Sequence, residues 1–188
     1  PTVLRFASYL VDAYQVTGKF KPARKLVNHI RELIDRENPQ LDVLEGVLLL
    51  AEGRPLKALK LFEKVEKEAG DLPQLRLRIA NAYLQLNKQD KAAKLLETAV
   101  GIDPEDSGAW YTLGVCRFEL AAYEPALEAL LQAIGLQYYH PPSHYYVGES
   151  LLAMQRYEEA ANAYDVCLRL APAMNRARER LISIYEHF

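Results

Sequence analysis

Hydrophobic positions along the chain fall into paired stretches, each about a dozen residues long, which a short polar break separates. Within each stretch the apolar residues recur every three or four positions, the spacing of one face of an α-helix. The pattern therefore predicts helix–turn–helix units and an all-α fold. One such unit cannot bury its apolar face alone, so neighbouring units must stack.

The paired stretches repeat at an offset of 34 residues. The segment AWYTLGVCRFELAAYEPALEALLQAI, from Ala109, aligns with SHYYVGESLLAMQRYEEAANAYDVCL, from Ser143, and the same offset leads back to Leu75 and Leu41. From Leu41, an offset one residue longer leads back to a fifth copy at Phe6. We expect five copies, at residues 4–38, 39–72, 73–106, 107–140 and 141–174.

A half copy, NRARERLISIYEHF, fills residues 175–188 and is predicted to cap the stack. Its apolar residues form one stripe, and its large ones are expected to pack on the helix before it: Leu181, Ile182, Ile184, Tyr185 and Phe188.

Small residues recur at fixed positions of the repeat. The second helix of each copy (helix B) carries an alanine at one such position: Ala23, Ala58, Ala92, Ala126 and Ala160. The first helix (helix A) carries Val11, Gly46, Ala80, Gly114 and Gly148 at another. Because glycine costs about 1 kcal/mol inside a helix, three glycines at one position predict close contact between paired helices.

At these positions the chain resembles the tetratricopeptide repeat family. The fourth copy carries the fullest match: Trp110, Leu113, Gly114, Tyr123, Ala126 and Ala133. Pro104 and Pro172 occupy the family's inter-repeat proline position, which Gly70 and Tyr138 occupy elsewhere; Glu45, Arg76 and Arg117 replace expected core residues. The resemblance covers residues 4–188. It implies a single right-handed superhelical solenoid over residues 1–188, non-catalytic, that binds a peptide or partner segment in a concave groove lined by the A helices.

The family's groove positions, carried onto this chain, define a candidate site. They run from an aliphatic part, through a polar patch, to an aromatic part: Val43, Val47, Arg78, Asn81, Gln85, Tyr111, Val115, Phe118, Tyr145 and Glu149. The segment LDVLEGVLLLA, from Leu41, is apolar nearly all round, which is typical of a helix covered on every face. A partner could cover Val43 and Val47, or neighbouring parts of the chain could bury them.

The segment YYHPPSHYYVGE, from Tyr138, is dense in groups that bind metals or catalyse reactions. Pro141 and Pro142 suit a helix start, and Pro39 and Pro73 hold the same position. His140 precedes that start and His144 lies inside the helix, so the two histidines, although four residues apart, do not share a helical face as an i,i+4 metal pair would, and no third ligand with suitable spacing follows. We expect no metal and no cofactor here, with Tyr145, Tyr146 and Glu149 lining the groove. Cys116 and Cys167 lie at packing positions and lack a local activating base.

Composition limits the classes of partner that the chain is expected to bind. The net charge of −2 argues against binding nucleic acid through phosphate contacts, and no apolar run is long enough to cross a membrane. Two cysteines without a CxxC pattern favour a reducing compartment, so we expect a cytoplasmic protein. The remaining classes of partner are a protein or peptide and another domain of the same parent chain.

Two functions compete with general peptide binding. Some family members clamp the C-terminal carboxylate of chaperone tails, but here only Arg78 and Asn81 could serve; the full clamp is absent, so the sequence does not support chaperone-tail binding. The segment from Leu136 to Tyr164 also looks like repeat tails of alkaline-phosphatase-like phosphohydrolases. The alternative function is therefore that of a structural or regulatory tail of a larger enzyme.

Overall fold

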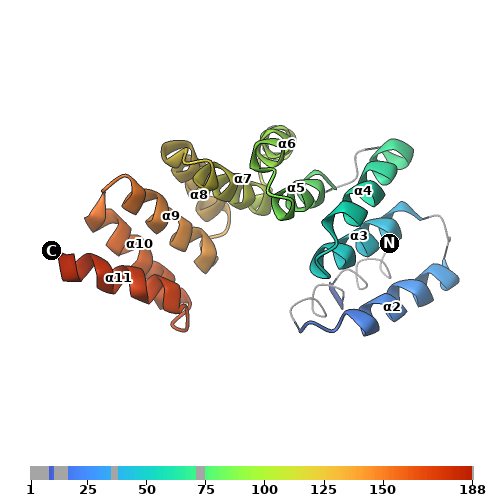
Figure 1. Cartoon of the computed structure of the whole chain (residues 1–188), viewed down its shortest axis with the longest axis horizontal. Coiled ribbons are helices and arrows are strands. Elements are labelled where there is room, and N and C mark those ends of the chain that lie inside the picture. Colours follow the sequence, from blue (N-terminus) through green and yellow to red (C-terminus); the bar gives the residue numbers. More distant parts are fainter. Residues whose placement is uncertain (1–8, 11–16, 35–37, 71–74, 188) are drawn as a thin grey trace. The chain divides into compact units, whose positions relative to one another are not determined.

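The regular secondary structure in the described part of the chain is entirely helical (Figure 1). The computed structural model describes residues 9–10, 17–34, 38–70 and 75–187. Its packing divides the chain into two compact units, Pro1–Lys88 and Gln89–Phe188, and each is described by itself. The all-α helical-repeat fold that the sequence predicts is confirmed.

The first unit contains α2 (Phe20–Leu33), α3 (Pro39–Ala51), α4 (Pro55–Ala69) and α5 (Leu75–Gln85). Each of these helices packs on the next, and α3 also contacts α5. The A helices of two successive predicted copies are therefore neighbours, as the stacking of helix pairs requires. Helix A of the first predicted copy falls mostly outside the described residues.

The second unit contains α6 (Gln89–Ile102), α7 (Ser107–Glu119), α8 (Tyr123–Leu136), α9 (Pro141–Ala153), α10 (Tyr157–Leu170) and α11 (Asn175–His187). Consecutive helices again pack together, and α7 contacts α9. The B helices begin 34 residues apart, at Gln89, Tyr123 and Tyr157, as do the A helices at Ser107, Pro141 and Asn175. The division into five copies and a cap remains our proposal.

Helix starts follow from local chemistry. Pro39, Pro55 and Pro141 each occupy a first helical position, where the missing N–H of proline costs no hydrogen bond. The predicted starts at Pro39 and Pro141 are confirmed, whereas Pro73 lies outside the described residues. Helix α7 begins differently, with the Asp106 carboxylate accepting a hydrogen bond from the Ala109 amide at 3.0 Å.

The turns from helix A to helix B share one backbone conformation. At the same position in each turn, Gly53, Asn87, Ala121 and Gln155 have φ angles of 70°, 54°, 59° and 61°. The amide of the following residue then donates back into the helix, as Arg54 N does to Leu49 O at 2.9 Å. This left-handed closure is the usual C-terminal cap of a helix, and it turns the chain toward helix B.

Small residues allow the paired helices to approach closely. All five repeat-position alanines of the B helices are fully buried. A methyl group added at Gly114 would lie 2.6 Å from Leu130 Cγ, and one at Gly148 would lie 2.6 Å from Tyr164 Cε1. At Gly46 it would overlap the ring of Phe62. The prediction that these glycines mark close helix contacts is confirmed, while Val11 lies outside the described residues.

Two of the charged residues at expected core positions pair with opposite charges. The Glu45 carboxylate lies 3.2 Å from Arg31 Nη2, which also contacts Asp42 at 2.9 Å. Arg117 Nη2 lies 3.2 Å from Glu97 Oε1. Because these ion pairs join neighbouring helices, the charged residues remain compatible with stacking.

The last helix, α11, packs on α10. Ala177 and Ile184 are buried there, and Leu181 is partly buried against the same core. The prediction that Ile182 and Tyr185 also pack is wrong, because their side chains are 48% and 69% exposed. Positions 177, 181 and 184 share one helix face, whereas 182 and 185 lie on the next. Phe188 lies outside the described residues.

Candidate protein-interaction surface

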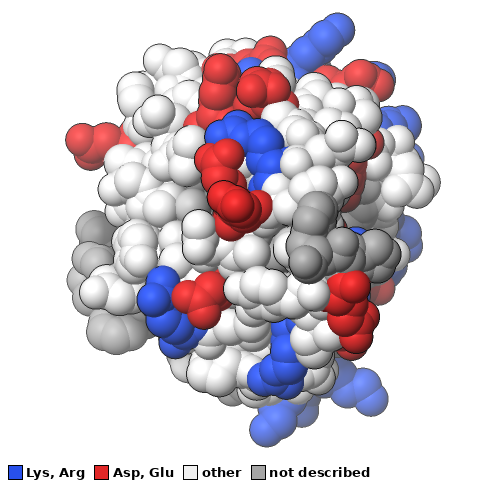
Figure 2. All heavy atoms as spheres, turned by 90° about the vertical axis from the view of Figure 1, so that its left-hand side faces the viewer, with Lys and Arg blue, Asp and Glu red and all other residues white. Residues whose placement is uncertain are grey.

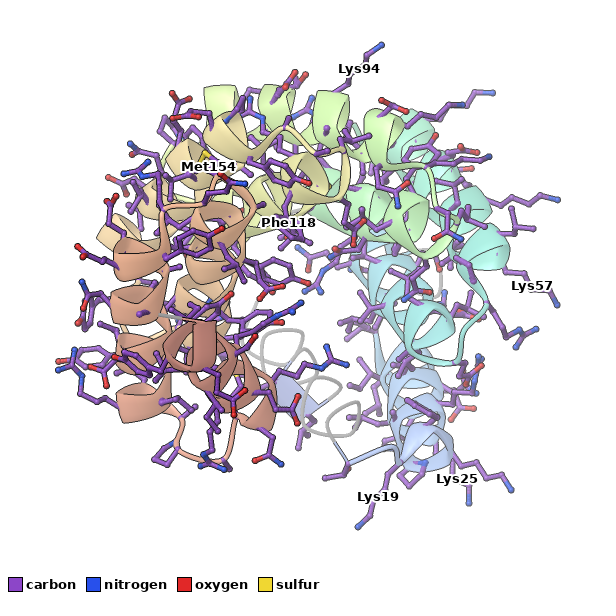
Figure 3. The ribbon with its side chains drawn as sticks, turned by 60° about the vertical axis from the view of Figure 1, so that its left-hand side comes forward. Lys19, Lys25, Lys57, Lys94, Phe118 and Met154 are labelled. Atoms are coloured by element: carbon purple, nitrogen blue, oxygen red, sulfur yellow. The ribbon has the colours of Figure 1, made fainter. Side chains whose placement is uncertain are left out.

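Four aromatic side chains from neighbouring A helices of the second unit form a contact network, which we term the aromatic row: Tyr111, Phe118, Tyr145 and Tyr146. Tyr146 lies at its centre. Its ring centroid is 6.1 Å from that of Tyr111, 5.6 Å from Phe118 and 5.5 Å from Tyr145, each pair meeting edge to face. Such contacts fix the rings relative to one another. Helices α7 and α9 thus share one aromatic face, and Phe118, one of its rings, is labelled in Figure 3.

Further rings extend the row at both ends. His140 meets Tyr111 edge to face at 4.7 Å, and Tyr123 contacts Phe118 at 5.7 Å. Tyr145 also contacts the fully buried Tyr164 of α10 at 5.9 Å. The row is therefore held between the loop that precedes α9 and the core beneath α9.

The tyrosines of the row are half-buried and keep their hydroxyl protons at neutral pH. Burial raises the pKa of Tyr111 to about 12, and it is also the main reason that the pKa values of Tyr145 and Tyr146 are raised. A protonated phenol donates one hydrogen bond and presents an apolar ring. The face can therefore contact apolar groups and donate to acceptors on a partner.

Glu149, a predicted groove residue, is already engaged within the chain. Its carboxylate accepts from the Tyr164 hydroxyl at 2.5 Å and pairs with Arg180 of α11. Only 10% of its side chain is exposed. Glu149 thus positions the helices around the row, and its charge is neutralised. Val115, the remaining predicted residue of this unit, is half-buried on α7.

A hollow of about 440 Å³ lies beside Tyr145. Helix α11 contributes its other lining residues, which are Arg176, Glu179, Arg180 and Ser183. Arg176 is exposed, and its charge lowers the pKa values of Tyr145 and Tyr146, opposing the effect of burial. A guanidinium group therefore lies close to the aromatic row. The sequence interpretation of α11 as a capping helix did not include this contribution.

In the first unit the predicted aliphatic part is mostly covered. Val47 and Leu50 are 4% and 7% exposed, whereas Val43 is half-buried. Burial within the chain, the alternative considered from the sequence, therefore applies to Val47. The polar patch lies on α5, where Arg78 and Asn81 are half-buried and Gln85 is exposed. Their spacing of three and four residues places them on one helix face.

The two histidines of the YYHPPSHYYVGE segment make structural contacts. His140 Nδ1 lies 2.8 Å from Ser143 Oγ, and His144 Nε2 lies 2.9 Å from the Tyr138 carbonyl oxygen. Since a carbonyl only accepts, His144 Nε2 carries a proton and cannot ligate a metal in this arrangement. Among the described residues, no group of three His, Cys, Asp or Glu side chains is placed to hold a metal ion.

The His144 contact belongs to a repeated motif. Trp110 Nε1 donates to the Pro104 carbonyl at 2.9 Å, and Arg178 Nη2 donates to the Pro172 carbonyl at 2.5 Å. Positions 110, 144 and 178 are equivalent in the 34-residue frame, and each bonds the carbonyl six residues before it. Three different donors therefore tie the inter-repeat loops to the next A helix.

The cysteines are buried, as the sequence predicts. Cys116 and Cys167 have no exposed surface, and burial raises the pKa of Cys116 to about 12. A thiol that stays protonated at neutral pH is a poor nucleophile. These residues therefore serve as small core groups.

Two family models match the chain. The tetratricopeptide repeat model matches residues 49–99, and the model of the anaphase-promoting complex, cyclosome, subunit 3 matches residues 90–167. Together the matches extend over parts of both units, and they include the buried alanines at 58, 92, 126 and 160 and the close glycine contacts at 114 and 148. The chain carries tetratricopeptide-type repeats over the matched residues 49–167. Its fold class and the resemblance stated from the sequence are thereby confirmed.

Solved tetratricopeptide repeat (TPR) structures share this fold. TTC0263, a thermophilic TPR protein of Thermus thermophilus, matches with a TM-score of 0.78 and 19% identity, over 97% of this chain and 98% of its own. A crystal structure of MamA matches at 0.70 and 24% identity, over 76% of this chain and 83% of its own. MamA 41-end from Desulfovibrio magneticus RS-1 matches at 0.69 and 19% identity, over 93% and 98%. At these identities the likeness shows the fold alone.

A curated relative adds a functional indication. The heat-shock protein cognate (HSC) co-chaperone sgt12 of Aspergillus fumigatus is 35% identical over 98 residues. The alignment covers 51% of this TPR chain and 29% of the co-chaperone, so the chain spans less than a third of that relative. The tetratricopeptide repeats themselves indicate a protein-interaction scaffold. In the described residues no helix is long and apolar enough to cross a membrane.

Proposed function

We propose that this TPR chain binds a partner protein, or a peptide segment of one, on the aromatic row of its second unit. The observation that carries the proposal is the arrangement around Tyr146, which holds three further rings of α7 and α9 in one half-buried face. Fixed aromatic side chains that keep part of their surface accessible are favoured anchors for protein partners, because little entropy is lost when they are covered.

Polar groups at the edge of the row support an extended segment as the ligand. The tyrosine hydroxyls can donate to backbone carbonyls, and Arg176 places a positive charge beside Tyr145. A few polar groups around apolar anchors is the usual construction of a binding site. The Glu149 carboxylate already accepts hydrogen bonds from Tyr164 and Arg180 of the same chain, so a partner does not have to supply donors to it.

The polar patch of α5 is proposed as a second contact area, in the first unit. Within the described part of the chain, Arg78 and Asn81 have no side-chain hydrogen bond, and both keep part of their surface accessible. Asn81 can pair with a peptide group through its amide, and Arg78 can pair with a carbonyl or a carboxylate. Val43 is the aliphatic residue retained in this proposal, and Val47 is not retained because it is buried.

The partner's identity divides into three classes. The co-chaperone relative suggests a chaperone tail, although the full carboxylate clamp is absent from the sequence. A segment of the same parent chain is the second class, and an unrelated cytoplasmic protein is the third. Acidic and basic side chains lie side by side in small groups on the face in Figure 2, which supports a protein partner over nucleic acid. The full parent sequence would test the alternative of an enzyme's repeat tail.

A peptide selection tests the proposal. A displayed random-peptide library is selected on the purified chain, and the affinity of an enriched peptide is measured by calorimetry. Tyr145→Ala and Phe118→Ala should each weaken binding about tenfold or more, as expected for anchor residues near the centre of an interface. Circular dichroism should show an unchanged helix content.

Leu131→Ala serves as the matched control, because Leu131 is 51% exposed on the B helix α8. It should leave the affinity unchanged. Binding that survives both row variants at the affinity of the unmodified chain would refute the proposal.

A further inference from the structure

Two neighbouring loops of the second unit form an edge that the aromatic row does not use. The first loop connects α6 to α7 and the second connects α8 to α9. They lie side by side, since the Ser107 hydroxyl donates to Gln137 Oε1 at 3.1 Å. The motif that ties Trp110 to Pro104 and His144 to Tyr138 gives both loops the same arrangement. Residues 34 apart therefore occupy equivalent places on this edge.

The edge exposes large apolar side chains. At one equivalent position, Ile102 and Leu136 are 61% and 45% exposed. Beyond Leu136, Tyr138 is 50% and Tyr139 80% exposed, with their rings edge to face at 5.4 Å. Single exposed apolar residues are common, but several on adjoining loops mark a surface suited to a partner.

The charge of the edge has one sign. Asp103 and Glu105 are exposed on the first loop, and Glu105 is equivalent to Tyr139 on the second. No lysine or arginine occurs between Lys94 and Arg117, or between Arg117 and Arg156. In the described residues neither carboxylate forms an ion pair. The apolar side chains therefore adjoin two negative charges with no positive charge on the same loops.

We propose that this loop edge docks a basic amphipathic segment of a partner protein. The edge consists of Ile102, Asp103, Glu105, Leu136, Tyr138 and Tyr139. An apolar side chain of the partner covers Ile102 and Leu136. A neighbouring arginine or lysine stacks on the exposed Tyr139 ring and pairs with a carboxylate of the first loop. Nucleic acid is disfavoured, because its phosphates would meet Asp103 and Glu105.

This surface is separate from the proposed peptide site on α7 and α9, so the two can be tested independently. A short peptide of alternating leucine and arginine serves as the probe, and its leucine–glutamate counterpart as the charge control. Each is titrated into the nitrogen-15-labelled chain at low and at high salt. The basic peptide should shift amide resonances of residues 102–105 and 136–139. Added salt should weaken the binding of this peptide, because salt screens the attraction between exposed charges.

Variants decide whether the named residues cause the binding. Tyr139→Ala and Glu105→Gln should each weaken the basic peptide about two- to fivefold, the range of an exposed cation–π contact or ion pair. The matched controls are Tyr185→Ala and Glu128→Gln, which remove an exposed tyrosine and an exposed carboxylate elsewhere in the unit. These controls, and Tyr145→Ala in the aromatic row, should bind as the unmodified chain does.

Four results would overturn the inference. In the first, the basic peptide does not bind at all, and in the second, the acidic peptide binds as tightly as the basic one. In the third, the resonance shifts are confined to other surfaces, and in the fourth, Tyr139→Ala and Glu105→Gln bind the basic peptide with the affinity of the unmodified chain.

Discussion

Arg180 of α11 forms a two-point ion pair with Glu149 of α9, with Nε 2.9 Å from Oε1 and Nη2 3.1 Å from Oε2. The Tyr164 hydroxyl of α10 donates to the same carboxylate. One nearly buried carboxylate therefore connects three helices at the end of the second unit. It lies next to the aromatic row, because Glu149 shares α9 with Tyr145 and Tyr146.

Arg180→Ala should destabilise the chain by about 1 kcal/mol, because it leaves the Glu149 carboxylate with a single donor in a poorly hydrated place. The free energy of unfolding from urea denaturation measures this loss. Arg169→Ala is the control, since Arg169 pairs with Asp165 on the exposed side of α10 and should contribute about 0.3–0.5 kcal/mol. Equal losses in the two variants would contradict the role of Arg180.

Gly148→Ala should destabilise the chain by about 1–3 kcal/mol, the usual cost of overpacking, because the added methyl would meet the Tyr164 ring. Gly135→Ala is the matched control. Gly135 also lies inside a helix, but an added methyl there has open space, so the variant should gain about 0.5–1 kcal/mol. Thermal unfolding distinguishes the two, and a stabilised Gly148→Ala variant would show that the helices are not in close contact.

The Arg24–Glu52 pair predicts a pH-dependent stability. Both guanidinium bonds to Glu52 are 2.7 Å, and the bond to Arg24 is the main cause that lowers the pKa of Glu52. A lowered carboxyl pKa stabilises the folded chain above the unfolded pKa of about 4.3, and this contribution is lost as the pH falls through the folded value. Arg24→Ala should therefore lower the unfolding free energy by about 0.5–1 kcal/mol at neutral pH.

The difference in unfolding free energy between Arg24→Ala and the unmodified chain should vanish at a pH low enough to protonate Glu52. Denaturation at a series of pH values from neutral down to about 3 checks this. Lys57→Ala, which removes an exposed lysine that points away from α4 in Figure 3, is the charge control. A difference that persists in acid would mean that Arg24 acts through packing.

The histidines of the YYHPPSHYYVGE segment are predicted to be structural. Because His144 donates to the Tyr138 carbonyl, His144→Ala should destabilise the chain by about 1 kcal/mol through loss of that bond. Metal analysis of purified protein is the accompanying measurement. Stoichiometric zinc that disappears when His140 and His144 are both replaced by alanine would contradict the prediction.

The repeat period made most of the fold predictable. The 34-residue offset gave the order of the helices, and proline chemistry gave the starts at Pro39 and Pro141. The glycines at 46, 114 and 148 indicated close contacts that the structure contains. These features are local or periodic, so the sequence alone carries them.

The candidate site was predictable only in part. Tyr111, Phe118 and Tyr145 were placed on A helices, but the central role of Tyr146 depends on ring contacts between two helices. The engagement of Glu149 by Arg180 joins residues 31 positions apart, which no helix period indicates. The sequence did not predict the exposure of Ile182 and Tyr185. The stripe of apolar residues on α11 is broader than the contact with α10, and the sequence pattern does not show where that contact ends.

The central claim is that a partner segment lies on the aromatic row, and intermolecular NMR contacts test it most directly. The selected peptide, bound to the labelled chain, should show nuclear Overhauser effects from its side chains to the rings of Phe118, Tyr145 and Tyr146. Contacts only to residues on the outer faces of B helices, such as Lys94, which points away from α6 in Figure 3, would contradict it.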